Sequence, residues 1–232
     1  MIRFVVQLLI TCVTASLCSC YSLLSKEKAV FTVACVGDSI TFGNGIEQRT
    51  RNSYPAQLGR QLGPQWSVRN FGVSGATLLQ RGDLPYQQQR ALRRAVSCEP
   101  DLVIIMLGSN DSKTHNWRHK QDFIADYIDL IHQFQRLPTG PAVWLAYPPP
   151  AYSRQWNIND TVIRGEICPL IDVIAEHTGA RVIDCHEPLR GRPHLFSDTI
   201  HPNKQGAAAL VRIIAASIRN HQSHETVFEN AG

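Results

Sequence analysis

Ser39 stands at the end of an apolar run in the N-terminal part of the chain. The segment 33–45 reads VACVGDSITFGNG, and Ser39 follows the apolar residues directly after Gly-Asp. A buried strand that delivers a serine into a turn is typical of a nucleophile. The common G-x-S-x-G elbow is absent, because Thr41 stands two positions after Ser39. Ser39 alone can equally cap the next helix, so its chemistry depends on partners elsewhere in the chain.

One of the nine histidines has the neighbours that a nucleophilic serine requires. His201 follows Asp198 by three residues and precedes Pro202, in the segment DTIHP. An imidazole must take the serine proton and pass it to the leaving group, and a carboxylate must fix its tautomer. We therefore expect Ser39, His201 and Asp198 to be catalytic.

Two further segments contain groups that can stabilise a developing oxyanion. The first is the glycine turn GVSGAT, in which we assign Gly75 to the site and Gly72 to the backbone alone. The second is LGSND, in which Asn110 supplies a carboxamide. As an isolated residue, Asn110 is better explained as a turn residue that bonds its own backbone, and its place in LGSND after a buried strand favours the oxyanion role. We expect Asp38 to accept loop N–H groups, and Asp111 to brace its own loop.

These polar segments follow apolar runs that alternate with helical patterns. We predict strands over 29–36, 66–71, 101–107, 142–147 and 181–185, and helices over 53–62, 86–96, 119–137, 160–178 and 203–220. Such alternation favours a parallel sheet with helices on both faces. Ligands of such sheets bind beyond the carboxyl ends of the strands, where the polar segments lie.

The four segments, in this order, resemble the SGNH, or GDSL-type, hydrolase family over roughly residues 33–206. The resemblance implies a flavodoxin-like three-layer α/β/α fold with a five-stranded parallel sheet. It implies that Ser39 is the nucleophile and that Asp198 and His201 complete the triad. It also implies an oxyanion hole made of the Ser39 and Gly75 backbone N–H groups and the Asn110 side chain.

Longer motifs resemble a bacterial subset described as sialate O-acetylesterase-like carbohydrate esterases. They are GDSITFGNGI, SYPAQL, VRNFGVSGATLL, GSNDSK and DTIHPNKQG. This resemblance implies hydrolysis of acetyl esters on carbohydrates such as sialic acid or xylan, with no metal and no cofactor.

Three other functions remain open. One is a lysophospholipase or thioesterase that acts on longer acyl chains. Another is a phosphoesterase in which Asp38, Asp111, Asp198 and His201 bind divalent cations, although two-metal phosphatases usually contain more His and Asp together. The third, a catalytically inactive binding protein, is disfavoured by the complete set of catalytic residues.

Several large side chains are expected in or near the loops at this edge. Trp117, Lys120 and Tyr147 are our predicted substrate-binding residues, and Trp156 lies in the same region. Aromatic residues there can stack on a sugar ring, but they can equally serve packing.

Residues 1–25 differ from the rest of the chain. Arg3 is the only charge before Lys26, and an apolar run from Phe4 to Val13 follows it. We interpret this region as a secretory signal or a lipoprotein signal, in which LCSC resembles a lipobox and Cys20 is the acylated residue. We expect an extracytoplasmic protein, with a hydrolase domain over 26–221 and a flexible tail over 222–232.

The composition limits the remaining partners. The chain has 232 residues and a formal net charge of +4, which suits one domain. The densest basic cluster, Arg90, Arg93 and Arg94, has helical spacing and is read as a solvated helix face, so no nucleic-acid partner is expected. Cys35, Cys98, Cys168 and Cys185 form no CxxC pair, and buried free thiols are their default interpretation.

Overall fold

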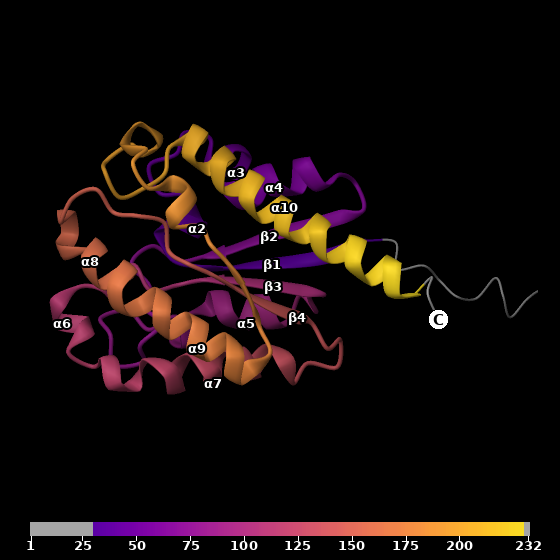
Figure 1. Cartoon of the computed structure of the whole chain (residues 1–232), viewed down its shortest axis with the longest axis horizontal. Coiled ribbons are helices and arrows are strands. Elements are labelled where there is room, and N and C mark those ends of the chain that lie inside the picture. The colour runs from indigo at the N-terminus through magenta and orange to yellow at the C-terminus, as the bar shows by residue number, and fades with distance from the viewer. Residues whose placement is uncertain (1–29, 230–232) are drawn as a thin grey trace, which may run out of the picture. The chain divides into compact units, whose positions relative to one another are not determined.

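The sheet has five parallel strands in the order β2-β1-β3-β4-β5 (Figure 1). This computed structural model describes the backbone of residues 30–229 and the side chains of residues 30–221. The strands are β1 (Phe31–Gly37), β2 (Trp66–Gly72), β3 (Leu102–Met106), β4 (Ala142–Ala146) and β5 (Arg181–Ile183). The predicted fold class is confirmed, and all five predicted strands are present.

Alternate residues of each strand contribute to two separate cores, because successive side chains point to opposite faces. Ala34 and Val36 of β1 pack in one core, and Val33 and Cys35 pack in the other. All five residues of β3 are buried, as expected for the central strand of a sheet covered on both faces.

Two helices cover one face of the sheet and three cover the other (Figure 1). The first face carries α4 (Tyr54–Leu62) and α10 (Lys204–Glu229), and the second carries α5 (Arg90–Val96), α7 (Phe123–Gln135) and α9 (Cys168–Thr178). The helix α4 begins with Pro55 in its first turn, and α9 ends before Gly179 at φ +69°, both as predicted.

Short helical segments occupy the connections. They are α2 (Ser39–Phe42), α3 (Arg49–Asn52), α6 (Thr114–Trp117) and α8 (Asp160–Val162), with the single turns η1 (Tyr86–Gln88), η2 (Lys120–Asp122), η3 (Gln155–Asn157), η5 (Glu187–Leu189) and η6 (Pro193–Leu195).

The helix predicted over 160–178 is interrupted by a wide turn. It divides into α8, the π-helical turn η4 (Ile163–Ile167) and α9. Pro169 stands at the start of α9 and lacks the N–H that a regular helix would bond to the carbonyl four residues earlier. The wide turn directly before it accommodates that missing hydrogen bond.

The C-terminal helix is longer than predicted. The helix α10 continues to Glu229, whereas we expected it to end near Asn220 and to be followed by a flexible tail over 222–232. The sequence contains no glycine or proline between Gly206 and Glu229, so nothing in that stretch terminates the helix.

Two other predictions concern cysteines and membrane segments. The predicted signal region 1–25, with Cys20, lies outside the described residues. Cys35, Cys98, Cys168 and Cys185 are free thiols, and all except Cys98 are buried. Within residues 30–229, every helix is too short or too polar to cross a membrane.

Candidate active site

Ser39 begins α2 directly after β1, at the carboxyl end of the sheet. Asp38 caps this one-turn helix: its Oδ1 accepts the Ile40 N–H at 2.9 Å. The helix ends at Gly43, whose φ of +88° is readily adopted by glycine. The Ser39 side chain is 7% exposed, so its hydroxyl lies at the floor of the site rather than on an open surface.

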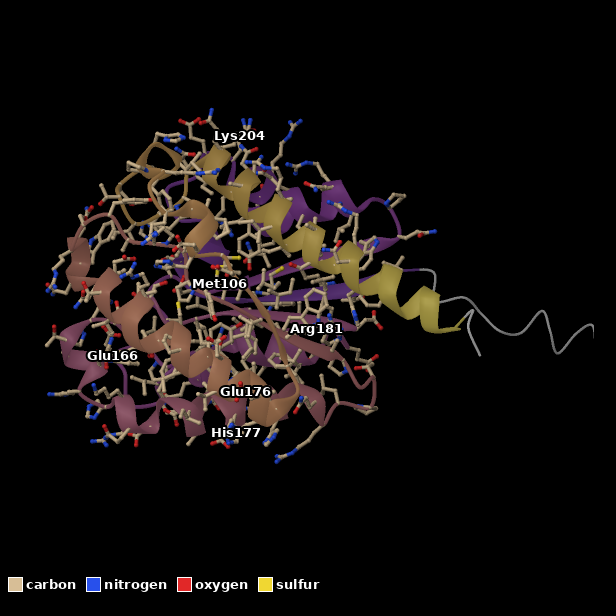
Figure 2. All side chains as sticks on the ribbon, in the orientation of Figure 1. Met106, Glu166, Glu176, His177, Arg181 and Lys204 are labelled. Atoms are coloured by element: carbon tan, nitrogen blue, oxygen red, sulfur yellow. The ribbon has the colours of Figure 1, made fainter. Side chains whose placement is uncertain are left out.

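Two glycines let α2 lie directly on the strand ends. A Cβ on Gly37 would lie 2.1 Å from Thr41 Oγ1 and 2.6 Å from the carbonyl oxygen of Met106, which Figure 2 labels. A Cβ on Gly72 would lie 2.1 Å from the Phe42 backbone nitrogen. Gly72 therefore serves the backbone, as predicted, and both glycines fix the height of Ser39 above the sheet.

The three predicted catalytic side chains form one hydrogen-bonded chain. His201 Nε2 lies 2.9 Å from Ser39 Oγ, and His201 Nδ1 lies 2.7 Å from Asp198 Oδ2. The Asp198 carboxylate accepts a hydrogen bond from the Nδ1–H group, so Nε2 is left as the acceptor for the serine hydroxyl. His201 is 5% exposed, so the imidazole is held between Ser39 and Asp198 in a largely buried position.

The Asp198 carboxylate is held by the backbone as well as by the imidazole. Its Oδ1 accepts the Ile200 N–H at 3.1 Å and the His201 N–H at 2.7 Å. Burial alone would raise the pKa of Asp198, but these hydrogen bonds and the His201 ring lower it below the ordinary value. Asp198 is therefore ionised at neutral pH and orients His201.

Three candidate donors lie around the nucleophile. Within residues 30–229, the backbone N–H groups of Ser39 and Gly75 have no protein acceptor, so both are free to donate to a ligand. Gly75 has φ +84°, a conformation that favours glycine. Asn110 uses one amide proton on the Ala76 carbonyl oxygen at 3.1 Å, which leaves the second proton for an oxyanion.

Asn116 fixes the Asn110 loop, although sequence reasoning did not single it out. Its side-chain amide donates to the Asn110 carbonyl oxygen at 2.9 Å and to Asp83 Oδ1 at 2.9 Å. The Asp83 partner cannot be found by spacing, because it lies in another loop, 33 residues earlier in the chain.

Two buried carboxyl groups lie beneath the site. Asp111 accepts hydrogen bonds from the N–H groups of Leu78 and Leu79 at 3.0 and 2.8 Å. It therefore holds the loop after β2, whereas we had expected it to hold its own loop. Asp38 accepts a loop N–H, as predicted. Burial raises the pKa of Asp38 to about 6 and that of Asp111 to about 7.

The Asp38 carboxyl has one oxygen without a hydrogen-bond partner. Asp38 Oδ2 and the Ser109 hydroxyl are both buried and unpartnered among the described residues. The Ser109 hydroxyl lies near enough to Asp38 to lower the pKa of this carboxyl, but the two groups do not complete a hydrogen bond.

The three predicted substrate-binding residues have protein partners of their own. Trp117 is 7% exposed, and its indole N–H donates to Glu166 Oε2 at 3.0 Å. Lys120 pairs with the same oxygen at 2.7 Å, and the Tyr147 hydroxyl donates to Asp172. Figure 2 places Glu166 at the same end of the molecule as the loops beyond the strand ends. Their role in substrate binding stays a prediction, and the buried Trp117 ring offers little free surface.

Trp156 is instead the aromatic residue beside the catalytic imidazole. Its ring centroid lies 5.1 Å from that of His201, at an interplanar angle of 52°. Sequence reasoning placed Trp156 near the edge of the sheet but had no signal for this contact, which depends on how two loops close on each other.

A curated protein is similar to most of this chain. It is an acetylxylan esterase from Xylanibacter ruminicola, 40% identical over 212 residues. The match covers 84% of this chain and 44% of the relative, so the chain spans less than half the length of that protein.

Solved structures share the fold. A carbohydrate acetylesterase from Sinorhizobium meliloti matches with a TM-score of 0.65 and 20% identity, over 82% of this chain and 99% of that one. An aryl esterase from M. smegmatis matches with a TM-score of 0.64 and 21% identity, over 82% and 99% of the chains. A two-domain esterase active on acetylated mannans matches with a TM-score of 0.60 and 24% identity, over 82% of this chain and 50% of that one.

The family profile covers the whole site. The GDSL-like Lipase/Acylhydrolase profile matches residues 35–209, which span every segment from Ser39 to His201. The order of the four segments, their placement at the strand ends and this match lead to one conclusion: the chain belongs to the GDSL-like lipase/acylhydrolase family.

Proposed function

We propose that this protein is a serine esterase that removes acetyl groups from carbohydrates. The observation that carries the proposal is the chain of hydrogen bonds from Ser39 Oγ through His201 to Asp198, at 2.9 and 2.7 Å. A serine hydroxyl in this arrangement can be deprotonated as it attacks an ester carbonyl. No step requires a cofactor.

In the first half of the reaction, Ser39 Oγ attacks the acetyl carbon and His201 Nε2 takes its proton. The negative charge that develops on the carbonyl oxygen is stabilised by the Ser39 and Gly75 N–H groups and the Asn110 amide. The tetrahedral intermediate collapses as His201 returns the proton to the ester oxygen, and the sugar alcohol leaves.

In the second half, water hydrolyses the acetyl-serine. His201 Nε2 takes a proton from the water, whose oxygen attacks the acetyl carbon, and the same donors stabilise the oxyanion. Collapse of this intermediate returns the proton to Ser39 Oγ and releases acetate. Asp198 stays ionised throughout and stabilises the imidazolium that forms twice in each cycle.

The carbohydrate acetyl ester is supported by the relatives. The 40% identical relative is an acetylxylan esterase, and similar folds include a carbohydrate acetylesterase and an esterase active on acetylated mannans. We propose xylan or sialic acid as the acetylated carbohydrate. We also propose that the chain acts outside the cytoplasm, because its first 25 residues resemble an export signal.

The metal-dependent alternative is less consistent with the site. A two-metal phosphoesterase needs several oxygens that converge on one point. Asp111 uses both carboxylate oxygens on backbone N–H groups, and Asp38 uses one. Within the described residues, no three His, Cys, Asp or Glu side chains are grouped as metal ligands would be.

A substrate panel tests the proposal. Hydrolysis of p-nitrophenyl acetate, butyrate, octanoate and palmitate gives the acyl preference, and acetate release is measured from acetylated xylan and O-acetylated sialic acid. We expect acetate to be preferred, because a short pocket cannot bury a longer acyl chain. A longer pocket would instead gain up to about 0.8 kcal/mol from each additional methylene that it buries. A preference for octanoate or palmitate, with no acetate released from either carbohydrate, would instead support a lysophospholipase or thioesterase.

A chelation control accompanies this panel. The esterase mechanism predicts full activity after treatment with EDTA. Loss of activity that is restored by a divalent cation would support the phosphoesterase alternative.

A further inference from the structure

Trp156 is an exposed aromatic side chain at the catalytic centre. It is 50% exposed, whereas Trp117 and Trp144 are 7% and 3% exposed. A large exposed apolar ring is unusual, because removing such a side chain from water is strongly favourable. The ring lies against the His201 imidazole, with centroids 5.1 Å apart, so its free surface borders the reacting atoms.

The backbone holds Trp156 in an unfavourable conformation. Trp156 has φ +52° and the following Asn157 has φ +63°, so two consecutive residues other than glycine are in the left-handed region. This conformation costs about 1–2 kcal/mol for a residue such as Trp156, and less for an asparagine, which adopts it more readily. Strain of this size persists only where the surrounding structure imposes it, and it is concentrated at functional sites.

The surrounding contacts fix the loop on both sides of Trp156. On the N-terminal side, the Tyr152 N–H donates to the Thr199 carbonyl oxygen at 2.8 Å, and the hydroxyls of Ser153 and Thr199 form a hydrogen bond at 2.5 Å. On the C-terminal side, Ile158 is buried and the Asn159 N–H donates to Ser112 Oγ at 2.9 Å.

Thr199 lies between the two catalytic residues Asp198 and His201 in sequence. The Trp156 loop is therefore hydrogen-bonded to the segment that carries Asp198 and His201, and the indole lies against the imidazole. Such coupling is not needed for packing alone, because a half-exposed ring buries little apolar area.

The reaction geometry identifies what the free face of Trp156 meets. His201 Nε2 must donate its proton to the ester oxygen of the leaving alcohol, so that oxygen lies within hydrogen-bond distance of the imidazole. In an acetylated xylose residue of xylan, this oxygen is bonded directly to a ring carbon. The sugar ring is thus brought beside the imidazole, where the indole ring lies.

We propose that Trp156 is the stacking surface for the sugar ring that bears the scissile acetyl group. This inference rests on the proposed function, and it assigns Trp156 to the leaving-group side, beside His201. A pyranose has an apolar face of C–H groups and polar hydroxyls at its rim. An indole that is half exposed can cover that face while the hydroxyls stay in water.

Steady-state kinetics with two acetyl esters tests the proposal. Acetylated xylo-oligosaccharides present a sugar ring to Trp156, whereas ethyl acetate has an alcohol too small to cover the indole. We expect Trp156→Ala to raise KM for the oligosaccharide about tenfold and to lower its kcat/KM about tenfold more than that for ethyl acetate. Trp156→Tyr should keep most of the wild-type kcat/KM for the oligosaccharide, because tyrosine retains a flat aromatic face.

The outcomes separate this inference from the proposed function. If the wild-type protein deacetylates the oligosaccharide and Trp156→Ala lowers kcat/KM equally for both esters, Trp156 acts only through His201 and the inference is wrong. If the wild-type protein hydrolyses ethyl acetate but releases no acetate from acetylated xylan or sialic acid, the proposed function is wrong, and the inference that rests on it is wrong as well.

A binding measurement provides a readout without catalysis. In the Ser39→Ala background, acetylated xylo-oligosaccharide should change the tryptophan fluorescence of the full chain. The test variant is Trp156→Phe, and its matched control is Trp66→Phe. Trp66 packs against Phe31 at the end of β2 that lies away from the site. We expect the ligand-induced change to be lost in the first variant and kept in the second. The reverse pattern would overturn the proposal.

Discussion

The catalytic residues act as a unit, because each hydrogen bond between Ser39, His201 and Asp198 sets the protonation state of the next group. We expect Ser39→Ala and His201→Ala each to lower kcat on the order of 10³-fold or more. Kinetics on p-nitrophenyl acetate measure this loss, and a serine-reactive phosphonate should add mass to the peptide that contains Ser39. Labelling of a different peptide would contradict the assignment.

Asn110 offers a separate test of oxyanion stabilisation. Its free amide proton meets a full negative charge only in the transition state, so Asn110→Ala should lower kcat by about 10²–10³ with a smaller change in KM. A change confined to KM would assign Asn110 to substrate binding instead. Asn116→Ala, which removes the contact to the Asn110 carbonyl, should give a smaller loss in kcat.

The buried carboxyl of Asp38 makes stability depend on pH. Burial raises its folded pKa to about 6, from 3.8 for an unperturbed carboxyl. The stabilisation is fully present below the unfolded pKa and is lost as the pH rises through the folded pKa. In Asp38→Asn, the side-chain oxygen can still accept the Ile40 N–H, and the amide can donate to the unpartnered Ser109 hydroxyl.

We therefore expect the wild-type unfolding free energy to fall between pH 5 and pH 8 by about 1–2 kcal/mol more than that of Asp38→Asn. Urea unfolding at the two pH values measures the difference. Asp129→Asn, on the exposed surface of α7, is the control. An identical pH dependence in wild type and Asp38→Asn would show that Asp38 does not titrate in this range.

At the level of elements, α2 carries the nucleophile only because glycines lie beneath it. Gly72→Ala would place a Cβ 2.1 Å from the Phe42 backbone nitrogen, so α2 must move away from the strand ends. We expect a loss of about 1–3 kcal/mol in unfolding free energy together with a loss of kcat, because Ser39 moves relative to His201.

The control for this substitution is Gly165→Ala, since a Cβ there meets no heavy atom within 4 Å. Thermal unfolding and kinetics on the two variants separate crowding beneath α2 from the general effect of replacing a glycine by alanine. If Gly72→Ala keeps wild-type stability and kcat, α2 is not held in place by close packing.

The sequence predicted the elements whose signals are local. The strand β3 was evident from the apolar run LVIIM, and the end of α9 from Gly179. The triad was evident because Ser39 follows the first predicted strand and because Asp198 and His201 lie in the short motif DTIHP. The interruption of the helix over 160–178 was missed, although Pro169 was a local signal for it.

Features that depend on loop closure were not predictable in this way. Trp117 and Trp156 lie in loops of similar composition, yet the first is buried against Glu166 and the second is exposed beside His201. The hydrogen bonds that decide this, from the Trp117 indole N–H to Glu166 and from the Tyr152 N–H to the Thr199 carbonyl oxygen, join residues more than forty positions apart. Hydrophobic periodicity contains no information about such pairs.

At the scale of the whole molecule, we propose that residues 1–25 direct the export of the enzyme. If Cys20 is the acylated residue of a lipoprotein signal, Cys20→Ser should release the protein from the membrane fraction of the producing cell. Fractionation and mass spectrometry of the mature N-terminus measure this. An unchanged distribution, with an N-terminus at another residue, would indicate an ordinary signal peptide.

The separation of the two reacting side chains in the chain has a consequence for biosynthesis. His201 follows Ser39 by 162 residues and immediately precedes α10, which packs beside α4 over the sheet. A ribosome therefore completes the nucleophile, the oxyanion donors and all five strands before it adds the base. Chains that stop before His201 lack the general base and α10, so we expect the onset of hydrolysis during synthesis to follow the docking of α10 on the sheet.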